Sequence, residues 1–222
     1  MSPVAVLFDI DGTLITTGGA GAVAWRLAFQ ELHGVPADIG AFSDAGMTDL
    51  EVGARTFSSV IGRPSAAEEL EELLAVRLRH LPRAVAESSR YRVLPGVNDL
   101  LPRLAADGYL LGLTTGGSQA AARVKLARGG LNEYFRFGGF GSDSADRTEL
   151  TRVAIRRAAA MDGNGLKPHH CLVVGDTPLD IAAAHGAGAV ALGVASGHFG
   201  VAELEAAGAD HVIASLEEEL PL

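Results

Sequence analysis

The sequence has little cysteine and no long apolar run. Its 222 residues include one cysteine, so an internal disulfide and a zinc site built from cysteines are both excluded. No apolar stretch approaches the roughly 20 residues that a membrane-spanning helix needs. Residues 1–6 also lack the basic start of a signal peptide. We therefore expect a cytoplasmic protein with no membrane partner.

Positive charge is also scarce, and lysine especially so. The chain carries 18 basic and 27 acidic residues, which gives a net charge of −9, and its only lysines are Lys125 and Lys167. A protein that binds nucleic acid normally presents a basic patch, and none is visible here. Hydrophobic residues make up 48% of the chain, enough to bury a real core. The composition thus favours a globular protein that does not bind nucleic acid.

Short apolar runs of strand-favouring residues alternate with helical patterns. The predicted strands are 4–8, 109–115, 135–140, 171–174, 189–194 and 211–213. The predicted helices between and after them are 97–106, 118–128, 148–161, 179–185 and 201–207. Strands that alternate with helices in this way form right-handed βαβ units. The sequence therefore predicts an α/β fold with a doubly wound, Rossmann-like parallel sheet.

One stretch interrupts this alternation, because residues 18–86 show helical patterns and no convincing strand. The clearest of these patterns are 20–33 and 66–81. We predict an inserted helical cap domain over 17–88, with the α/β core formed by 1–16 and 89–222. The chain is expected to cross between the two domains at 15–21 and at 88–95.

Carboxylates follow two of the predicted strands. Asp9 and Asp11 come after the first strand, and Asp176 and Asp180 come after the strand at 171–174. The carboxyl ends of parallel strands meet at one edge of the sheet, where ligands bind, so we expect the four side chains to converge. Carboxylates at close range repel one another, and a bound cation removes this penalty. Oxygen ligands without histidine or cysteine favour Mg²⁺.

This arrangement suits phosphoryl transfer. Asp9 is the candidate nucleophile, which would form an aspartyl phosphate that water later hydrolyses. Asp11 is placed to protonate the leaving alkoxide and then to deprotonate the water. Thr115, at the end of another strand, can donate a hydrogen bond to the phosphoryl group. We assign Asp176 as a metal ligand, and Asp180 orients the site from the start of a helix.

The transferring group also needs a fixed positive charge. Lys167 lies just before the strand at 171–174 and so reaches the wrong edge of the sheet. Arg147 follows the third strand and precedes a helix, which places it at the right edge. We assign Arg147 as the residue that neutralises the phosphate, and Lys125, two turns into a helix, is the second choice.

These motifs resemble those of the haloacid dehalogenase superfamily, specifically its phosphoglycolate phosphatase-like hydrolases with a helical cap. The matching segments are Asp9-Ile10-Asp11-Gly12-Thr13, Thr115, Gly175-Asp176-Thr177-Pro178-Leu179-Asp180 and, where the cap rejoins the core, Pro95-Gly96-Val97. The resemblance implies that the backbone carbonyl of Asp11 joins the carboxylates around Mg²⁺, so the expected ligand set is Asp9, Asp11, Asp176 and Asp180. The family's third motif usually has lysine, where this sequence has Arg147.

The expected substrate is a small phosphorylated metabolite, of the phosphoglycolate or sugar phosphate type, and the expected assembly is a monomer or homodimer. We expect Thr115, Gly116 and Arg147 to bind the phosphate, and Thr48 and Asp49 of the cap to contact the substrate. Related caps often carry a basic residue in the Gly-x-Thr-Asp stretch, where this chain has Met47. A second anionic group on the substrate is therefore not expected to bind at Met47.

Three alternatives remain open. Ser118, in Gly116-Gly117-Ser118-Gln119-Ala120, imitates the nucleophile elbow of a serine hydrolase, with His198 or His211 downstream. It also fits the N-cap of a helix, which is the interpretation we favour. A phosphosugar mutase of the same superfamily, or a domain that accepts a phosphoryl group without turnover, would share the Asp9 motif. We expect the seven histidines to be structural or surface residues.

Overall fold

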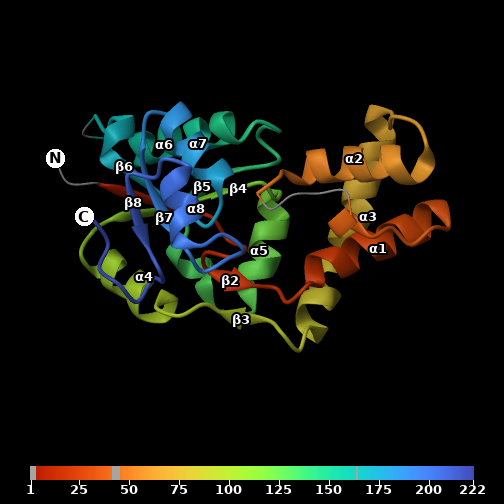
Figure 1. The fold of residues 1–222 in the computed structure, drawn as a ribbon, viewed down its shortest axis with the longest axis horizontal. Helices are drawn as coiled ribbons and strands as arrows, with labels where there is room; N and C mark the ends of the chain where they lie inside the picture. The colour runs from red at the N-terminus through yellow and green to blue at the C-terminus, as the bar shows by residue number, and fades with distance from the viewer. Residues whose placement is uncertain (1–3, 42–45, 164) are drawn as a thin grey trace.

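The computed structural model describes residues 4–41, 46–163 and 165–222, and a six-stranded parallel sheet forms the middle layer of its left-hand part in Figure 1. The strand order is β5-β4-β1-β6-β7-β8. The strands are β1 (Ala5–Phe8), β4 (Leu110–Thr115), β5 (Phe137–Phe140), β6 (Cys171–Gly175), β7 (Val190–Val194) and β8 (His211–Ile213). These are the six strands that the apolar runs predict, so the predicted parallel sheet is confirmed.

The first strand lies at the centre of the sheet, which explains its uninterrupted apolar sequence. Phe8 of β1 pairs with Leu113 of β4 on one side and with Val174 of β6 on the other. All four residues of β1 are fully buried because helices cover both faces. The three strands that lead into Asp9, Thr115 and Asp176 are therefore neighbours, and their carboxyl ends share one edge.

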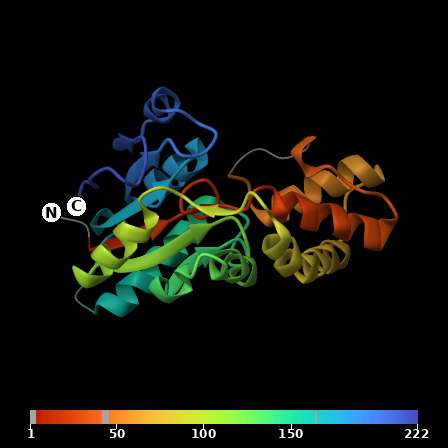
Figure 2. The same cartoon turned by 90° about the horizontal axis from the view of Figure 1, so that it is seen from below.

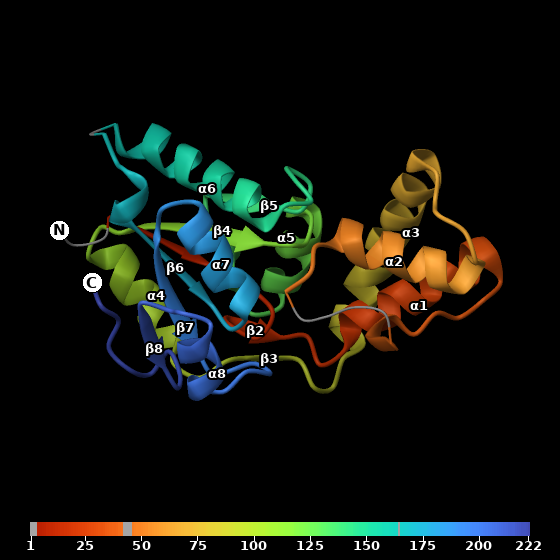
Figure 3. The ribbon, with the colours of Figure 1, turned by 45° about the horizontal axis from the view of Figure 1, so that its top comes forward.

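Helices pack on both faces, as in a doubly wound fold. The helices α4 (Val97–Ala106) and α5 (Gln119–Ala127) pack on one face. The other face is covered by α6 (Arg147–Asp162), α7 (Pro178–Gly186) and α8 (Val201–Ala206). Short 3₁₀ turns span Ile39–Ala41, Leu131–Tyr134 and Pro168–His170. Figure 3 shows α6 and α7 running over the sheet toward the edge that faces the remaining helices.

Three helices lie beside this sheet: α1 (Ala20–His33), α2 (Asp49–Ile61) and α3 (Ala67–Glu87), as Figures 1 and 2 show. They have a hydrophobic cluster of their own, which includes Trp25, Phe29 and Phe57. Within the described part of residues 18–86 there is no strand, as the sequence predicts. The exact domain boundaries at residues 16 and 88 stay a prediction. None of the helices described is both long and apolar enough to cross a bilayer.

The structure adds two short strands that the sequence analysis missed. The strands β2 (Ile15–Thr16) and β3 (Arg92–Val93) pair antiparallel at the two crossings between the sheet and the three helices. The crossings pack closely, because a Cβ atom at Gly18 would lie 2.5 Å from the Cβ of Arg90. Gly18 also has a φ of +62°, a conformation that L side chains rarely adopt.

The third helix is longer than predicted. The pattern predicts a helix over 66–81, whereas α3 continues to Glu87 with Pro82 inside it. A proline removes one helical hydrogen bond and usually ends or bends a helix. Here Leu81, Ala84 and Val85 are buried against α1 and α5, and this burial offsets the lost bond.

Candidate active site

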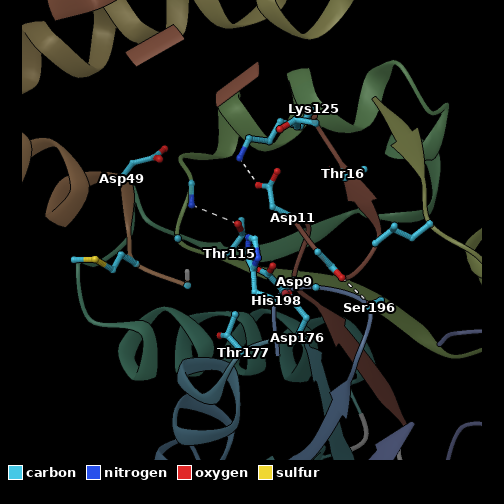
Figure 4. Close-up of a pocket in the computed structure, with 18 of the residues that line it drawn as sticks. Asp9, Asp11, Thr16, Asp49, Thr115, Lys125, Asp176, Thr177, Ser196 and His198 are labelled. Atoms are coloured by element: carbon cyan, nitrogen blue, oxygen red, sulfur yellow. Dashed lines mark hydrogen bonds and ion pairs between the residues drawn. The ribbon is translucent and has the colours of Figure 1, made fainter. Parts of the chain in front are cut away.

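A cavity of about 460 Å³ opens at the carboxyl ends of β1, β4 and β6 (Figure 4). Its floor carries Asp9, Asp11, Thr115 and Asp176, which come from three neighbouring strand ends. A volume of this size suits a small metabolite. Three of the four carboxylates that the sequence predicts to converge, Asp9, Asp11 and Asp176, therefore border one cavity.

Three of the four predicted carboxylates form a tight, buried cluster. One oxygen atom from each of Asp9, Asp176 and Asp180 lies within 4.8 Å of the other two. Asp11 is outside this cluster, and its side chain is 41% exposed. The three clustered carboxylates could hold a metal ion, whereas a metal contact by Asp11 would have to use its backbone carbonyl.

Two glycines make room for Asp176. A Cβ atom at Gly12 would lie 2.3 Å from Oδ2 of Asp176, and one at Gly197 would lie 1.7 Å from the same atom. The hydroxyl of Thr13 donates to the other oxygen, Oδ1, at 3.1 Å. The backbone of two loops therefore closes around one carboxylate and fixes its orientation.

Burial makes this carboxylate cluster electrostatically costly. Burial raises the pKa of Asp9 well above its ordinary value; repulsion from Asp180 raises it further, and the charge of Arg147 only partly opposes this. Burial and repulsion from Asp180 also raise the pKa of Asp176, to about 7. A bound divalent cation would offset both effects. The donor set, made only of oxygens, fits the hard cation Mg²⁺.

Asp180 is the third residue of α7 and is held by two kinds of partner. Its Oδ2 atom accepts from the backbone N–H of Thr177 at 3.1 Å and from the Thr177 hydroxyl at 2.7 Å. Thr177 is the N-cap of α7 and forms a capping box with Asp180. The Oδ1 atom of Asp180 pairs with Arg147. Asp180 thus joins the helix start to the cation beside the nucleophile candidate.

Arg147 is the first residue of α6, directly after the N-cap residue Asp146. Its Nη2 atom donates to Oδ1 of Asp9 at 3.2 Å and also pairs with Asp180, while Nη1 donates to the backbone carbonyl of Gly46 at 2.6 Å. Burial alone would lower the pKa of Arg147, but Asp180 and Asp9 outweigh this and raise it. The structure therefore places a fixed positive charge where the sequence analysis assigned it.

The two lysines have different positions relative to the cavity. Lys167 lies before β6, outside the residues that line the cavity. Lys125 reaches the cavity from α5, and its ammonium group pairs with the carboxylate of Asp11 (Figure 4). The helical position of Lys125 made it our second choice, because the sequence does not show which face of the helix points to the sheet edge.

The loop after β4 contains the other predicted phosphate-binding residues. Thr115 and Gly116 line the cavity, and the Thr115 hydroxyl accepts from the Gly117 N–H at 3.3 Å. Ser118 is the N-cap of α5, and its Oγ accepts from the backbone N–H of Ala121 at 3.2 Å. This geometry supports the interpretation of Ser118 as a helix cap.

The two cap residues predicted to bind substrate have different surroundings. Thr48 is buried, forms a capping box with Glu51 at the start of α2, and does not line the cavity. Asp49 does line it. The carboxylate of Asp49 accepts from Arg77 at 2.6 Å and from the backbone N–H of Ser118 at 3.3 Å. The structure thus gives Thr48 a structural role and leaves Asp49 as the candidate contact.

Sequence reasoning missed several residues of the site. Ser196, Gly197 and His198, in the loop after β7, line the cavity, and so does Arg92 of β3. His198 is exposed, in line with the expectation that the histidines are structural or surface residues, but it also borders the cavity (Figure 4). The rule that ligands bind beyond strand ends could have found this loop, since it follows a predicted strand.

The sequence matches a known protein family and several known proteins. The sequence model of the haloacid dehalogenase-like hydrolase family matches residues 4–188. A phosphoglycolate phosphatase from Rhodospirillum rubrum is 33% identical over 197 residues, which cover 84% of this chain and 77% of the relative. A probable phosphatase from Dickeya dadantii is 27% identical, and the match covers 98% of this chain and 92% of that protein.

Solved structures show the same fold. A hydrolase from Pseudomonas syringae has a TM-score of 0.74 at 24% identity, with coverage of 96% of this chain and 94% of the other. A β-phosphoglucomutase from Clostridium difficile has a TM-score of 0.72 at 20% identity, with coverage of 97% and 92%. With the family model matching most of its length, this chain belongs to the haloacid dehalogenase-like hydrolases, and among them it resembles the phosphoglycolate phosphatases.

Proposed function

We propose that the protein is a Mg²⁺-dependent phosphatase that hydrolyses a small phosphomonoester through an aspartyl phosphate on Asp9. One observation carries this proposal: the carboxylate of Asp9 is buried, contacts Arg147, and lies in one cluster with Asp176 and Asp180. A carboxylate held beside a fixed cation and a potential metal site is arranged to attack phosphorus. The family match and the phosphatase names of the relatives support the same reaction.

In the first step, a carboxylate oxygen of Asp9 attacks the phosphorus atom and the bond from phosphorus to the ester oxygen breaks. Asp11 gives its proton to the leaving alkoxide oxygen. In the second step, Asp11 takes a proton from water, whose oxygen attacks phosphorus. Inorganic phosphate leaves, and the carboxylate of Asp9 is restored. Asp11 suits the proton transfers because it borders the cavity outside the buried carboxylate cluster.

The remaining residues bind and neutralise the phosphoryl group. Arg147 supplies a permanent charge next to Asp9, and the Thr115 hydroxyl at the end of β4 donates to a phosphoryl oxygen. When bound, Mg²⁺ supplies further positive charge to that group. Asp9, Asp176 and the backbone carbonyl of Asp11 would hold the ion, with Asp180 as a further ligand or as the anchor of Arg147.

We place the substrate among the small phosphomonoesters, with phosphoglycolate first, since several relatives bear the name phosphoglycolate phosphatase. The cavity of about 460 Å³ supports a small molecule. Residues 17–88 act in this proposal as a cap domain that covers the site and excludes water. Asp49 contributes from the cap, because it lines the cavity.

The test is phosphate release from a panel of phosphomonoesters, including phosphoglycolate and hexose phosphates, with Mg²⁺ and with EDTA. Turnover that requires Mg²⁺ is the expected result. Absence of turnover on every ester would reject the proposal. Isomerisation of a hexose phosphate without net phosphate release would instead identify a mutase, a possibility that the phosphoglucomutase fold neighbour keeps open.

A further inference from the structure

We infer that Arg92 binds a second anionic group of the substrate, at the end of the cavity away from the reacting phosphoryl group. This inference rests on the proposed phosphatase function and names the class of substrate. The ligand would be a small phosphomonoester whose carbon skeleton carries a carboxylate or a second phosphate. The argument starts from the charges around the cavity.

Three permanent cations stand among the described residues that line the cavity, and two of them are already paired. Lys125 pairs with Asp11, and Arg147 pairs with Asp9 and Asp180. Arg92, the third, is exposed and forms no ion pair or side-chain hydrogen bond with any residue in the described part of the chain. A substrate anion can therefore bind Arg92 without displacing a carboxylate.

The cap provides no cation to compete for this role. Its described residues on the cavity wall are Thr17, Gly46, Met47 and Asp49, and the nearby Arg77 is buried behind Asp49 and paired with it. Asp49 would repel an anionic group on its side of the cavity. A second anion is thus directed away from the cap segment and toward the opposite wall.

Arg92 lies on that opposite wall. It pairs with Thr16 across the β2–β3 ribbon, and both residues line the cavity. Figure 4 shows Thr16 and Asp49 on opposite sides of Asp11. The paired ribbon fixes the backbone of Arg92 better than a loop would, and its guanidinium can bind a carboxylate or phosphate with two parallel hydrogen bonds.

The experiment compares two esters of similar size, phosphoglycolate and ethyl phosphate, which differ in the carboxylate. Arg92→Gln is expected to raise the KM for phosphoglycolate roughly 10- to 100-fold, the usual effect of losing a hydrogen bond to a charged group. The KM for ethyl phosphate should stay within about twofold of the wild-type value. Arg92→Lys should be intermediate for phosphoglycolate. Arg103→Gln, an exposed arginine of α4 outside the cavity, is the matched control and should change neither value.

Two outcomes overturn the assignment: an equal effect of Arg92→Gln on both esters, or no effect on either. Calorimetric binding of phosphoglycolate to the Mg²⁺-loaded protein gives a second readout that needs no turnover. If the wild type hydrolyses no ester, the proposed function is rejected. Weaker binding of phosphoglycolate by Arg92→Gln would still support the anion site, and unchanged binding would reject it.

Discussion

Arg147 donates through Nη1 to the backbone carbonyl of Gly46 at 2.6 Å, so the cation beside Asp9 also holds the chain segment that leads into α2. A Cβ atom at Gly46 would lie 2.8 Å from the Thr177 hydroxyl, which shows how closely this segment packs on the sheet domain. One guanidinium therefore connects the nucleophile candidate with the segment that leads into α2.

This contact predicts different effects for two substitutions of Arg147. Arg147→Met should lower kcat/KM about 100- to 1,000-fold, because the phosphoryl group loses its fixed charge. Arg147→Lys restores a charge, but an ammonium group cannot reach Asp9, Asp180 and Gly46 at once, so it should recover part of kcat and keep a raised KM. Steady-state kinetics on phosphoglycolate measure both. Equal activity of Arg147→Met and wild type would contradict the assigned role.

The pair between Arg77 and Asp49 should stabilise the protein. Both side chains are largely buried, and the Arg77 guanidinium also stacks over Trp25 at 4.8 Å. Arg77→Met leaves the Asp49 carboxylate without its partner, which should lower the free energy of unfolding by about 3–5 kcal/mol. Adding Asp49→Asn should recover part of the loss, as urea unfolding of the single and double variants would show. Additive effects would indicate that the pair is not coupled.

Ser118 distinguishes the phosphatase from a serine hydrolase. Because its hydroxyl caps α5, Ser118→Ala should lower the free energy of unfolding by about 1 kcal/mol and leave kcat unchanged. Activity assays and thermal unfolding of the same preparation test both halves of the prediction. Loss of activity in a folded Ser118→Ala protein would instead support the interpretation that the protein is a serine hydrolase.

Without metal, the protein should become less stable as the pH rises from about 4 to about 7. The pKa of Asp176 is about 7 in the folded protein, against about 3.9 in an unfolded chain. Between these pH values the folded state holds more protons than the unfolded state, so raising the pH favours unfolding. The stabilisation is complete below about pH 4 and is lost as the pH passes through about 7.

Thermal unfolding in EDTA and in Mg²⁺ checks this pH dependence. Mg²⁺ replaces the protons, so it should raise Tm more at about pH 8 than at about pH 5. Asp176→Asn should flatten the dependence of Tm on pH in EDTA. A Tm that increases between about pH 5 and about pH 8 in the metal-free wild type would contradict the electrostatic account.

The sequence predicts the sheet well because most of its strands are covered on both faces and are therefore largely apolar, although β8, at the edge, begins with the exposed His211. It also predicts the meeting of Asp9, Asp176 and Asp180, since parallel strands end at one edge. The pair β2 and β3 has no such signal, because two-residue strands depend on contacts between distant segments. Because the sequence analysis did not predict this strand pair, it also did not predict that Arg92 lines the cavity.

Side-chain direction is the other feature that the sequence could not provide. Thr48 and Asp49 are adjacent in the motif, yet one side chain caps α2 and the other lines the cavity. Lys125 reaches Asp11 only because α5 turns that face toward the sheet edge. The extension of α3 past Pro82 likewise depends on burial against other helices, which local propensity does not report.

The central claim is that Asp9 carries the phosphoryl group, and the most direct test is to trap it. In Asp11→Asn, para-nitrophenyl phosphate can still phosphorylate Asp9, because its leaving group needs no proton, whereas the water lacks its base. Mass spectrometry after acid quenching should find one phosphoryl group on the peptide that contains Asp9, and none in Asp9→Asn. A phosphoryl group on another residue, such as Ser118, or undiminished turnover in Asp9→Asn, would contradict the account.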